Sequence, residues 1–367
     1  MNLADIAAAA GLRTPVRHQL FINGQFVDAE SGETLATLNP HDNSIITGVS
    51  MAGKSDVDKA VAAAEKALPA WSRMSGMDRG RILLKLADLI EANAEELARL
   101  ESLDTGHPIR DSRMLDVPRT AVTFRYFGGM ADKFQGEQIP VEAGFLNYTL
   151  REPVGVVGQV VPWNFPLMFT SWKMAPALAA GNCVVMKPAE ITPLSSLKIA
   201  ELMAEAGMPA GVVNVLPGLG SVAGQYIAEH PGISKVAFTG STATGRRIVQ
   251  ASAGNLKKVQ LELGGKGANI VFDDANLVAV APGTSGGGAR GAASQAVLVI
   301  LGVNLLLIGG LASVVGRRAL MLFRRRTDAG ARLHLRFVTL FSMVALVPAV
   351  LVTPFATFAL NRLWVFG

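Results

Sequence analysis

Between residues 154 and 263 the chain alternates short apolar runs with segments of helix length. The apolar runs, rich in Val, Ile and Leu, cover residues 156–161, 183–186, 212–216, 233–238 and 259–263. The segments that separate them cover residues 167–180, 194–206, 221–229 and 244–253. Strands that alternate with helices and lack strict polar alternation are typical of a parallel sheet covered on both faces. The pattern therefore predicts an α/β fold with a doubly wound, Rossmann-like parallel sheet.

Shorter signals precede this region. An Asn-Gly pair between apolar residues predicts a hairpin over residues 20–27. Two helices should follow over residues 56–71 and 78–103, the second ending before Gly106. Residues 137–152 then predict two strands joined by a turn.

Two motifs carry a more specific signal. The first is Pro162-Trp163-Asn164-Phe165-Pro166 and the second is Leu261-Glu262-Leu263-Gly264-Gly265-Lys266. Together they resemble the signatures of the NAD(P)-dependent aldehyde dehydrogenase superfamily. The resemblance covers about residues 1–277, the NAD-binding part, and implies a relation to enzymes that convert an aldehyde and NAD into a carboxylate and NADH. In this family the arm over residues 137–152 takes part in subunit contacts, which implies that the chain can form a homo-oligomer.

The resemblance assigns catalytic roles to two residues. Asn164 matches the amide that donates a hydrogen bond to the aldehyde-derived oxyanion, a task that suits a neutral donor where negative charge develops. Its alternative interpretation is an Asn that stabilises a turn next to proline. Glu262 matches the general base that activates the water for thioester hydrolysis.

The resemblance also implies a set of cofactor-binding residues. Lys187 and Glu190 would hold the adenosine ribose, and the Glu190 carboxylate favours NAD over NADP because it accepts hydrogen bonds from free hydroxyls and repels a 2′-phosphate. The alternative for this pair is an ordinary solvated ion pair. The other members of the set are Pro162, Trp163, Gly220, Gly224, Gly240, Ser241, Gly245 and Leu263. Of these, the glycines and Ser241 in the turn over residues 240–245 suit a pyrophosphate at a helix N-terminus.

The nucleophile that the family needs is missing from its expected place. In the family a cysteine about thirty residues beyond the glutamate attacks the aldehyde carbon. This chain has a single cysteine, Cys183, which precedes Glu262. Cys183 falls in an expected apolar strand, where a thiol is usually inert, so it is predicted to be structural. The sequence therefore indicates an aldehyde dehydrogenase truncated before its catalytic domain and inactive for lack of its cysteine.

The sequence after residue 277 is of a different kind. Residues 278–295 form a Gly/Ala-rich linker by composition. Residues 296–315 and 337–360 are uncharged and long enough to cross a membrane as helices, with an Arg-rich loop at 316–336 between them. A two-helix transmembrane hairpin is therefore predicted; the alternative is a pair of buried core helices.

The tail over about residues 290–367 also resembles the N-terminal membrane region of nitrogen-regulation sensor histidine kinases. The sequence contains neither the phosphoacceptor His motif nor the ATP-binding domain of a kinase, so no kinase activity is implied. The positive-inside rule places the Arg-rich loop in the cytoplasm and both ends of the hairpin outside. That orientation conflicts with a cytoplasmic N-terminal domain, which needs dinucleotide and has no export signal.

Charge and cysteine content exclude other classes. After residue 277 there are nine Arg, no Lys and one acidic residue, so positive charge is concentrated between two apolar stretches, and nucleic-acid binding is not predicted. A single cysteine excludes an intramolecular disulfide, and five scattered His residues do not suggest a metal site. Two further hypotheses stay open. One is a membrane-tethered NAD-binding or regulatory module, and the other is a chimeric fusion joined near residue 277 with no selected function.

Overall fold

The computed structural model describes residues 16–265 and residue 272. The described residues up to Gly265 belong to one compact unit. The predicted linker over residues 278–295 and the predicted hairpin over residues 296–360 lie outside the described residues. Within the described part of the chain, no helix is both long and apolar enough to span a membrane.

A seven-stranded sheet forms the centre of this unit, in the order β11-β10-β7-β8-β9-β1-β2. Its parallel strands are β7 (Val156–Val160), β8 (Cys183–Lys187), β9 (Val213–Val215), β10 (Lys235–Thr239) and β11 (Lys258–Glu262). Each of them falls on one of the predicted apolar runs, so the predicted α/β fold with a parallel sheet is confirmed. The strands β1 (Leu20–Ile22) and β2 (Gln25–Val27) continue the sheet beyond β9 in antiparallel pairing, which makes the whole sheet mixed.

The turn between β1 and β2 is the predicted Asn-Gly hairpin. Asn23 and Gly24 have φ of 53° and 79°, and positive φ at both positions is what a type I′ turn requires. The backbone N–H of Asn23 donates to Oδ1 of Asn214 at 3.0 Å, which fastens the turn to β9. A second antiparallel pair, β3 (Thr34–Leu38) and β4 (Ile45–Ser50), forms a separate small sheet.

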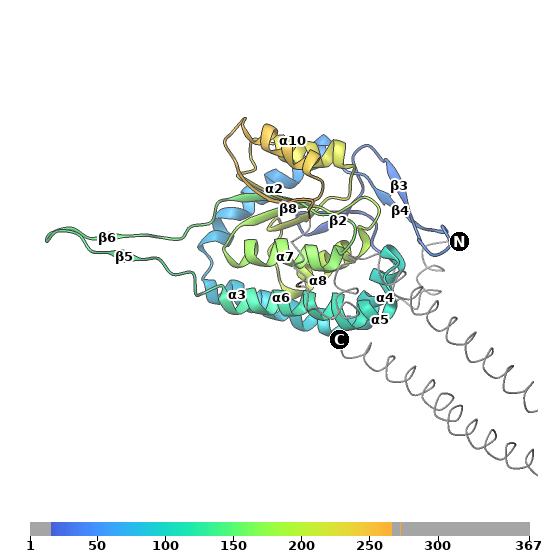
Figure 1. The fold of residues 1–367 in the computed structure, drawn as a ribbon, viewed down its shortest axis with the longest axis horizontal. Coiled ribbons are helices and arrows are strands. Elements are labelled where there is room, and N and C mark those ends of the chain that lie inside the picture. Colours follow the sequence, from blue (N-terminus) through green and yellow to red (C-terminus); the bar gives the residue numbers. More distant parts are fainter. Residues whose placement is uncertain (1–15, 266–271, 273–367) are drawn as a thin grey trace, which may run out of the picture. The chain divides into compact units, whose positions relative to one another are not determined.

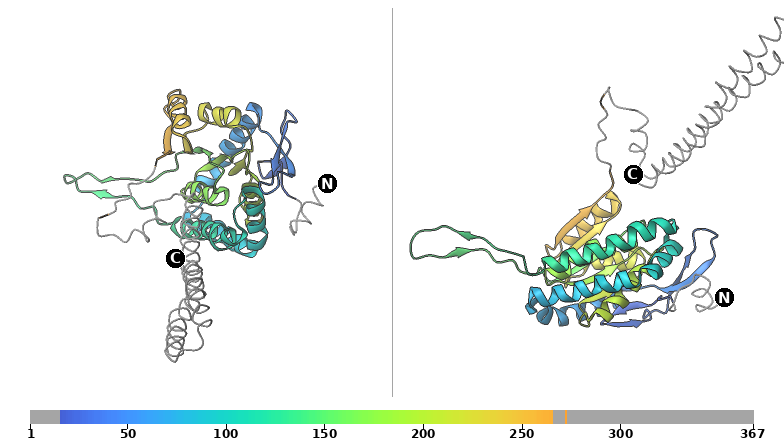
Figure 2. Two further views of the ribbon diagram at one scale, coloured as in Figure 1. Left: turned by 45° about the vertical axis from the view of Figure 1, so that its right-hand side comes forward. Right: turned by 90° about the horizontal axis from the view of Figure 1, so that it is seen from below.

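Helices lie on both faces of the large sheet, as Figures 1 and 2 show. One face carries α2 (Lys54–Arg73), α9 (Gln225–Glu229) and α10 (Thr242–Ser252). The other carries α7 (Pro166–Ala179) and α8 (Leu194–Ala206), with α3 (Gly76–Ala92), α4 (Ala94–Thr105) and α6 (Val117–Met130) packed outside them. Shorter segments are α5 (Ile109–Asp111) and the π-helical turns η1 (Ser112–Asp116) and η2 (Gly220–Gly224). Buried side chains of these layers form one continuous hydrophobic core.

The single helix predicted over residues 78–103 is wrong, because the structure has two helices there. α3 ends at Ala92 and α4 begins at Ala94, with Asn93 between them at φ −105° and ψ 20°. The side-chain amide of Asn93 donates to the backbone carbonyl of Leu89 at 2.8 Å. Such a local hydrogen bond competes with the helical pattern and ends α3 at this point. The end of α4 at Gly106, which has φ 78°, follows the prediction.

The prediction that both faces of the sheet are covered holds for β7 and β8 but is wrong for β11. All residues of β7 and β8 are buried. In β11 the half-buried Val259 and Leu261 alternate with the exposed Lys258, Gln260 and Glu262. The apolar pair packs against the core on the side of α10. The second face of β11 is therefore polar and open to solvent in the described part of the chain.

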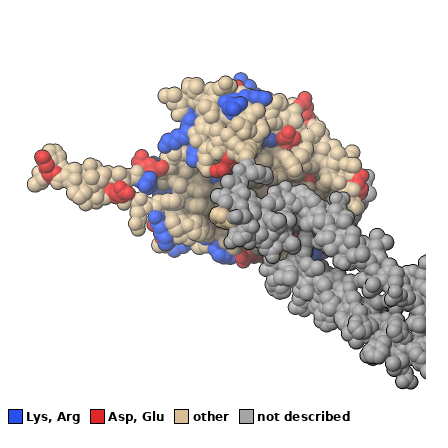
Figure 3. All heavy atoms as spheres, in the orientation of Figure 1, with Lys and Arg blue, Asp and Glu red and all other residues tan. Residues whose placement is uncertain are grey.

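An arm projects from the body of the domain between α6 and β7 (Figures 1 and 2). It is built from two short antiparallel strands, β5 (Gln138–Ile139) and β6 (Asn147–Tyr148). Apolar side chains near its tip are exposed, Phe145 at 76%. On the face of the molecule shown in Figure 3, basic and acidic side chains of the described residues are interspersed.

Candidate functional site

The carboxyl ends of the parallel strands meet along one edge of the sheet. β7 pairs with both β8 and β10, because the chain runs from β7 to β8 and β9 on one side and returns to β10 and β11 on the other. The carboxyl ends of β7 and β10 thus form a topological switch point, the place where doubly wound sheets bind ligands. The motifs over residues 161–166 and 240–245 directly follow these two strands.

The first of these motifs makes a tight turn that leads into α7. Phe165 precedes the helix with φ −149° and ψ 62°, and Pro166 is the first helical residue, a position where proline is well tolerated. The backbone carbonyl of Trp163 accepts a hydrogen bond from Oγ1 of Thr192 at 3.1 Å. The Trp163 side chain is 58% exposed, while Asn164 is half-buried. The turn therefore holds its backbone firmly and offers a large aromatic side chain to solvent.

Lys187 and Glu190 lie together at the end of β8. The Lys187 ammonium donates to the carbonyls of Pro188 at 2.6 Å and Gly218 at 3.0 Å and to Oε2 of Glu190 at 3.1 Å. Lys187 is buried, so a fully solvated ion pair is excluded for this residue. Burial lowers the pKa of Lys187. Burial alone would raise the pKa of Glu190, but the charge and hydrogen bonds of Lys187 and the backbone outweigh it and leave that pKa below its ordinary value. Glu190 is thus a carboxylate at the rim of the edge.

The second motif forms the N-terminus of α10. Ser241 caps the helix, because its Oγ accepts from the backbone N–H of Thr244 at 3.2 Å. The N–H of Gly240 donates to the carbonyl of Glu262 at 3.0 Å and ties the turn to β11. A Cβ on Gly245 would meet the Leu263 side chain at 2.5 Å, which accounts for a glycine there. Three of the predicted cofactor residues, Gly240, Ser241 and Gly245, therefore share one turn with Leu263 packed on it.

Gly220 and Gly224 bound the short turn η2 after β9. A Cβ on Gly220 would meet no other atom within 4 Å, so the surface there is open. A Cβ on Gly224 would lie 3.4 Å from Cδ of Lys187, so this glycine gives room to the buried lysine stem. These two glycines lie on the same edge as the other predicted cofactor residues, beyond β8.

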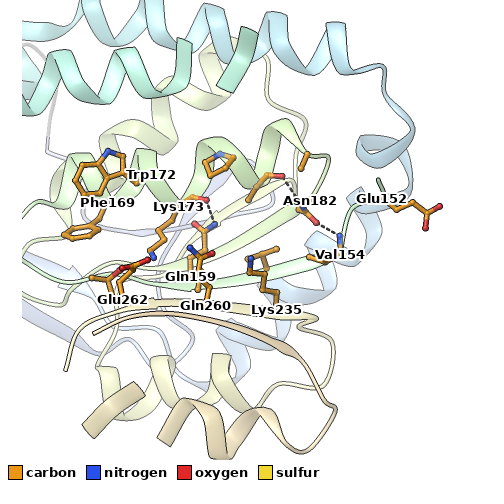
Figure 4. A pocket seen from close by; sticks show the side chains of 16 residues that line it. Glu152, Val154, Gln159, Phe169, Trp172, Lys173, Asn182, Lys235, Gln260 and Glu262 are labelled. Carbon is orange, nitrogen blue, oxygen red and sulfur yellow. Dashed lines mark hydrogen bonds between the residues drawn. The ribbon is translucent and has the colours of Figure 1, made fainter. Parts of the chain in front are cut away.

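A pocket of about 720 Å³ runs along the open face of β10 and β11, beside α7. Glu262 and Thr239 line one end of it, and Lys173 of α7 lines its wall. In Figure 4 the side chains of Lys173 and Glu262 point toward each other. Burial lowers the pKa of Lys173, while the charge of Glu262 opposes that shift. The pocket therefore places an acid and an amine side by side near the carboxyl edge of the sheet.

Cys183 is remote from this arrangement. It is the first residue of β8 and is fully buried, and burial raises the pKa of its thiol to about 12. Glu262 is the last residue of β11, at the opposite end of the sheet. A neutral thiol in the core is a poor nucleophile. The structure thus agrees with the prediction that Cys183 is structural.

One group of polar side chains beneath the first turn was not anticipated. Glu101, His107 and Asp116 each place an oxygen or nitrogen atom within 4.8 Å of the others. The sequence did carry a signal, because Glu101 follows Leu97 by four residues and falls on the buried stripe of α4. A carboxylate at a buried position normally has a dedicated partner. Its donor, the backbone N–H of Leu167, and the nearby pair of His107 and Asp116 become visible only in the folded chain.

Comparisons with known proteins agree with this arrangement. The family model "Aldehyde dehydrogenase family" matches residues 26–295, and the model "NtrY N-terminal region" matches residues 282–362. The chain is 52% identical over 269 residues to cytosolic 10-formyltetrahydrofolate dehydrogenase of Xenopus tropicalis, covering 71% of this chain and 30% of that protein. It is 51% identical over 264 residues to mitochondrial aldehyde dehydrogenase of Rattus norvegicus, covering 71% of this chain and 51% of that protein. The chain thus spans about half or less of the length of these relatives.

Solved structures show the same likeness. A putative aldehyde dehydrogenase from Burkholderia cenocepacia is 72% identical with a TM-score of 0.72, over 73% of this chain and 55% of the other. PnpE from Pseudomonas sp. WBC-3 is 67% identical with a TM-score of 0.71 and the same two coverages, and PnpE has also been solved in complex with nicotinamide adenine dinucleotide. Because the family model spans most of the chain and the fold and motif order agree with it, the chain belongs to the aldehyde dehydrogenase family.

Proposed function

We propose that residues 16–265 are the NAD-binding part of an aldehyde dehydrogenase that has lost its cysteine nucleophile. The observation that supports this most directly is the gathering of the predicted cofactor residues along one edge of the sheet, around the switch point between β7 and β10. The residues involved are Pro162, Trp163, Lys187, Glu190, Gly220, Gly224, Gly240, Ser241, Gly245 and Leu263. The bound ligand would be a dinucleotide, as in the PnpE complex.

The groups on this edge fit a dinucleotide. The N-terminus of α10 presents backbone N–H groups and a favourable dipole to a pyrophosphate. Ser241 contributes by fixing that turn, since its hydroxyl caps the helix. Glu190 offers a carboxylate to a ribose, and Trp163 offers an exposed aromatic surface. When bound, NAD would supply a hydride acceptor, and these residues would fix its position.

Glu190 supports NAD rather than NADP as the cofactor. A carboxylate accepts hydrogen bonds from free ribose hydroxyls and repels a 2′-phosphate. Calorimetry of the full chain with NAD and NADP tests this. The Glu190→Ala variant should weaken NAD binding by about tenfold, the size of one lost charge-assisted hydrogen bond. The Glu30→Ala variant is the matched control, because Glu30 is also a carboxylate paired with a lysine but lies away from the edge.

Equal binding of NAD and NADP to the native chain would contradict the cofactor preference. Unchanged NAD affinity in the Glu190→Ala variant would contradict the assignment of Glu190. No binding of either dinucleotide would contradict the proposed function as a whole.

Asn164 and Glu262 would be inherited parts of the aldehyde site, as oxyanion donor and general base. Glu262 lies at the mouth of the pocket beside α7, and its side chain is accessible from solvent. Hydrolysis needs a covalent thioester to act on, and the chain's single cysteine is buried far from Glu262. The aldehyde substrate is therefore proposed for the family reaction, with no turnover by this chain.

A second proposal concerns the tail. The match of residues 282–362 to the NtrY N-terminal region supports a membrane anchor that tethers the NAD-binding part. The overlap of this match with the aldehyde dehydrogenase match over residues 282–295 equally supports a chimera joined in the linker. A long sequencing read across the codons for residues 265–300 separates the two. One continuous reading frame supports the fusion, and two separate genes would show that the fusion does not exist.

A further inference from the structure

Resting on the proposed function, we propose that His107, held by Asp116, is a positioning residue for the turn that presents Trp163 and Asn164 to the cofactor and substrate. His107 lies in the short loop between α4 and α5, more than fifty residues before the turn in sequence. Its position in the sequence is far from both motifs and from the predicted cofactor residues. Its contacts in the fold are what give it this role.

Three contacts place His107 beneath the turn. Its Nδ1 lies 2.8 Å from Oδ2 of Asp116, which is 1% exposed. The backbone of Asn164 lies near enough to the imidazole to raise its pKa slightly. The ring meets Phe165 edge-on, with ring centroids 5.0 Å apart and planes at 61°. An imidazole with one nitrogen on a buried carboxylate and its ring packed edge-on against an aromatic side chain has a fixed orientation.

The neighbouring Glu101 fixes the other side of the same turn. Its Oε1 accepts the backbone N–H of Leu167 at 3.3 Å, in the first turn of α7. Acceptance by a carboxyl oxygen at this point satisfies an N–H that the helix leaves free. His107 and Glu101 therefore hold the turn at Phe165 and at Leu167, on either side of Pro166. The hydroxyl of Thr192 donates to the backbone carbonyl of Trp163 and fixes the turn at that residue as well.

The charge on His107 strengthens this arrangement. The hydrogen bond to Asp116 raises the pKa of His107 above its ordinary value, with smaller contributions from the charges of Asp116 and Glu101 and from the Asn164 backbone. The titratable groups near the ring are Asp116 from η1 and Glu101 from α4, with Asp104 next to Glu101. A charged imidazole can donate through both nitrogens, to Asp116 and toward the Asn164 backbone, whereas a neutral imidazole keeps only one donor. The hold on the turn should therefore weaken as pH rises through that pKa.

Hydrogen exchange of the full chain tests the positioning directly. His107→Phe keeps a ring beside Phe165 and removes the hydrogen bond to Asp116, so the backbone amides of the non-proline residues within 162–168 should exchange at least about tenfold faster at pH 7. His230→Phe is the matched control, because His230 also pairs with an aspartate, Asp58 at 3.1 Å, but contacts α2 and α9. It should leave residues 162–168 unchanged. Unchanged exchange at these residues in the His107→Phe variant would overturn the proposal.

NAD affinity supplies the functional test and separates it from stability. For the native chain, affinity should fall severalfold between pH 6 and pH 9. His107→Lys keeps a donor that stays charged over this range, so its affinity should be near the native value at pH 6 and flat with pH. His107→Gln, which has a neutral donor, should bind NAD at every pH as weakly as the native chain does at pH 9. A native pH profile in either variant would count against a role in presenting the turn to the cofactor. If the native chain binds no NAD, the proposed function fails, and the exchange comparison still decides the role of His107.

Discussion

Cys183 and Glu262 lie at opposite ends of the parallel sheet and are separated laterally by two strands. Cys183 pairs in register with Val156 at the start of β7, and Glu262 pairs with Thr239 at the end of β10. In a parallel sheet, residues at opposite strand ends cannot meet without breaking the sheet. The thiol and the expected general base of this chain can therefore take no part in one reaction.

The first prediction is that the full chain does not oxidise aldehydes with NAD. A covalent nucleophile is needed for the family reaction, and losing it typically removes several orders of magnitude of rate. NADH formation measured over a panel of aliphatic and aromatic aldehydes should be indistinguishable from the background of the Glu262→Gln variant. Cys183→Ala should give the same background. Turnover above the Glu262→Gln variant would show that another nucleophile exists.

The second prediction concerns the buried ammonium of Lys187. In the Lys187→Met variant the carbonyls of Pro188 and Gly218 lose their donor in the core. Buried acceptors without partners cost about 1–3 kcal/mol each, so the free energy of unfolding should fall by about 2 kcal/mol or more. Denaturant unfolding measures this change. Lys59→Met is the control, because Lys59 makes an exposed ion pair with Glu30 and should change little. A loss no larger than that of the control would mean that the carbonyls find other donors.

The third prediction is that the stability of the described unit falls between about pH 5 and pH 8. Burial raises the pKa of Glu101 to about 8 and that of Asp104 to about 7, so the folded chain holds protons there that the unfolded chain releases near pH 4. When the folded state binds more protons, the free energy of unfolding decreases as pH rises. The raised pKa of His107 acts in the same direction above pH 6.5.

Unfolding curves recorded across this pH range test the prediction, and Glu101→Gln should make the fall shallower. Glu95→Gln is a suitable control, because Glu95 is exposed and its two arginine partners lower its pKa to about 2. It should leave the slope above pH 5 unchanged. If the free energy of unfolding of the Glu101→Gln variant fell with pH as steeply as that of the native chain, Glu101 would not be the source of the fall.

The fourth prediction concerns the tail, whose sequence indicates a membrane hairpin. Expressed alone, residues 290–367 should insert with the loop at Gly316 in the cytoplasm, because basic loops stay on that side. The full chain should insert poorly, since the same orientation would export the folded NAD-binding part. Topology reporters fused after Gly316 and after Gly367 read out both cases. A loop found outside the cell, or a full chain stably inserted with an exported N-terminal part, would contradict the prediction.

The sequence by itself determined the sheet and most of the candidate edge. Apolar runs of strand length alternate with helical segments. A strand that is buried on both faces, such as β7 or β8, is rich in apolar residues, so its residue types alone predict it. The turn at Asn23 and Gly24 was equally predictable, because few residue pairs adopt positive φ at two successive positions. Motifs at the ends of such strands must share one edge in a parallel sheet, so the neighbourhood of residues 162–166 and 240–245 followed from order alone.

Tertiary structure alone decided how that edge is held. The break at Asn93 depends on a side chain that competes with the helix, against a continuous apolar stripe. The open polar face of β11 depends on which elements pack there, which strand periodicity does not specify. The contact of His107 with Phe165 joins segments more than fifty residues apart. Such pairings are set by the packing of α4 against α8 and η1, and no local pattern in the sequence encodes them.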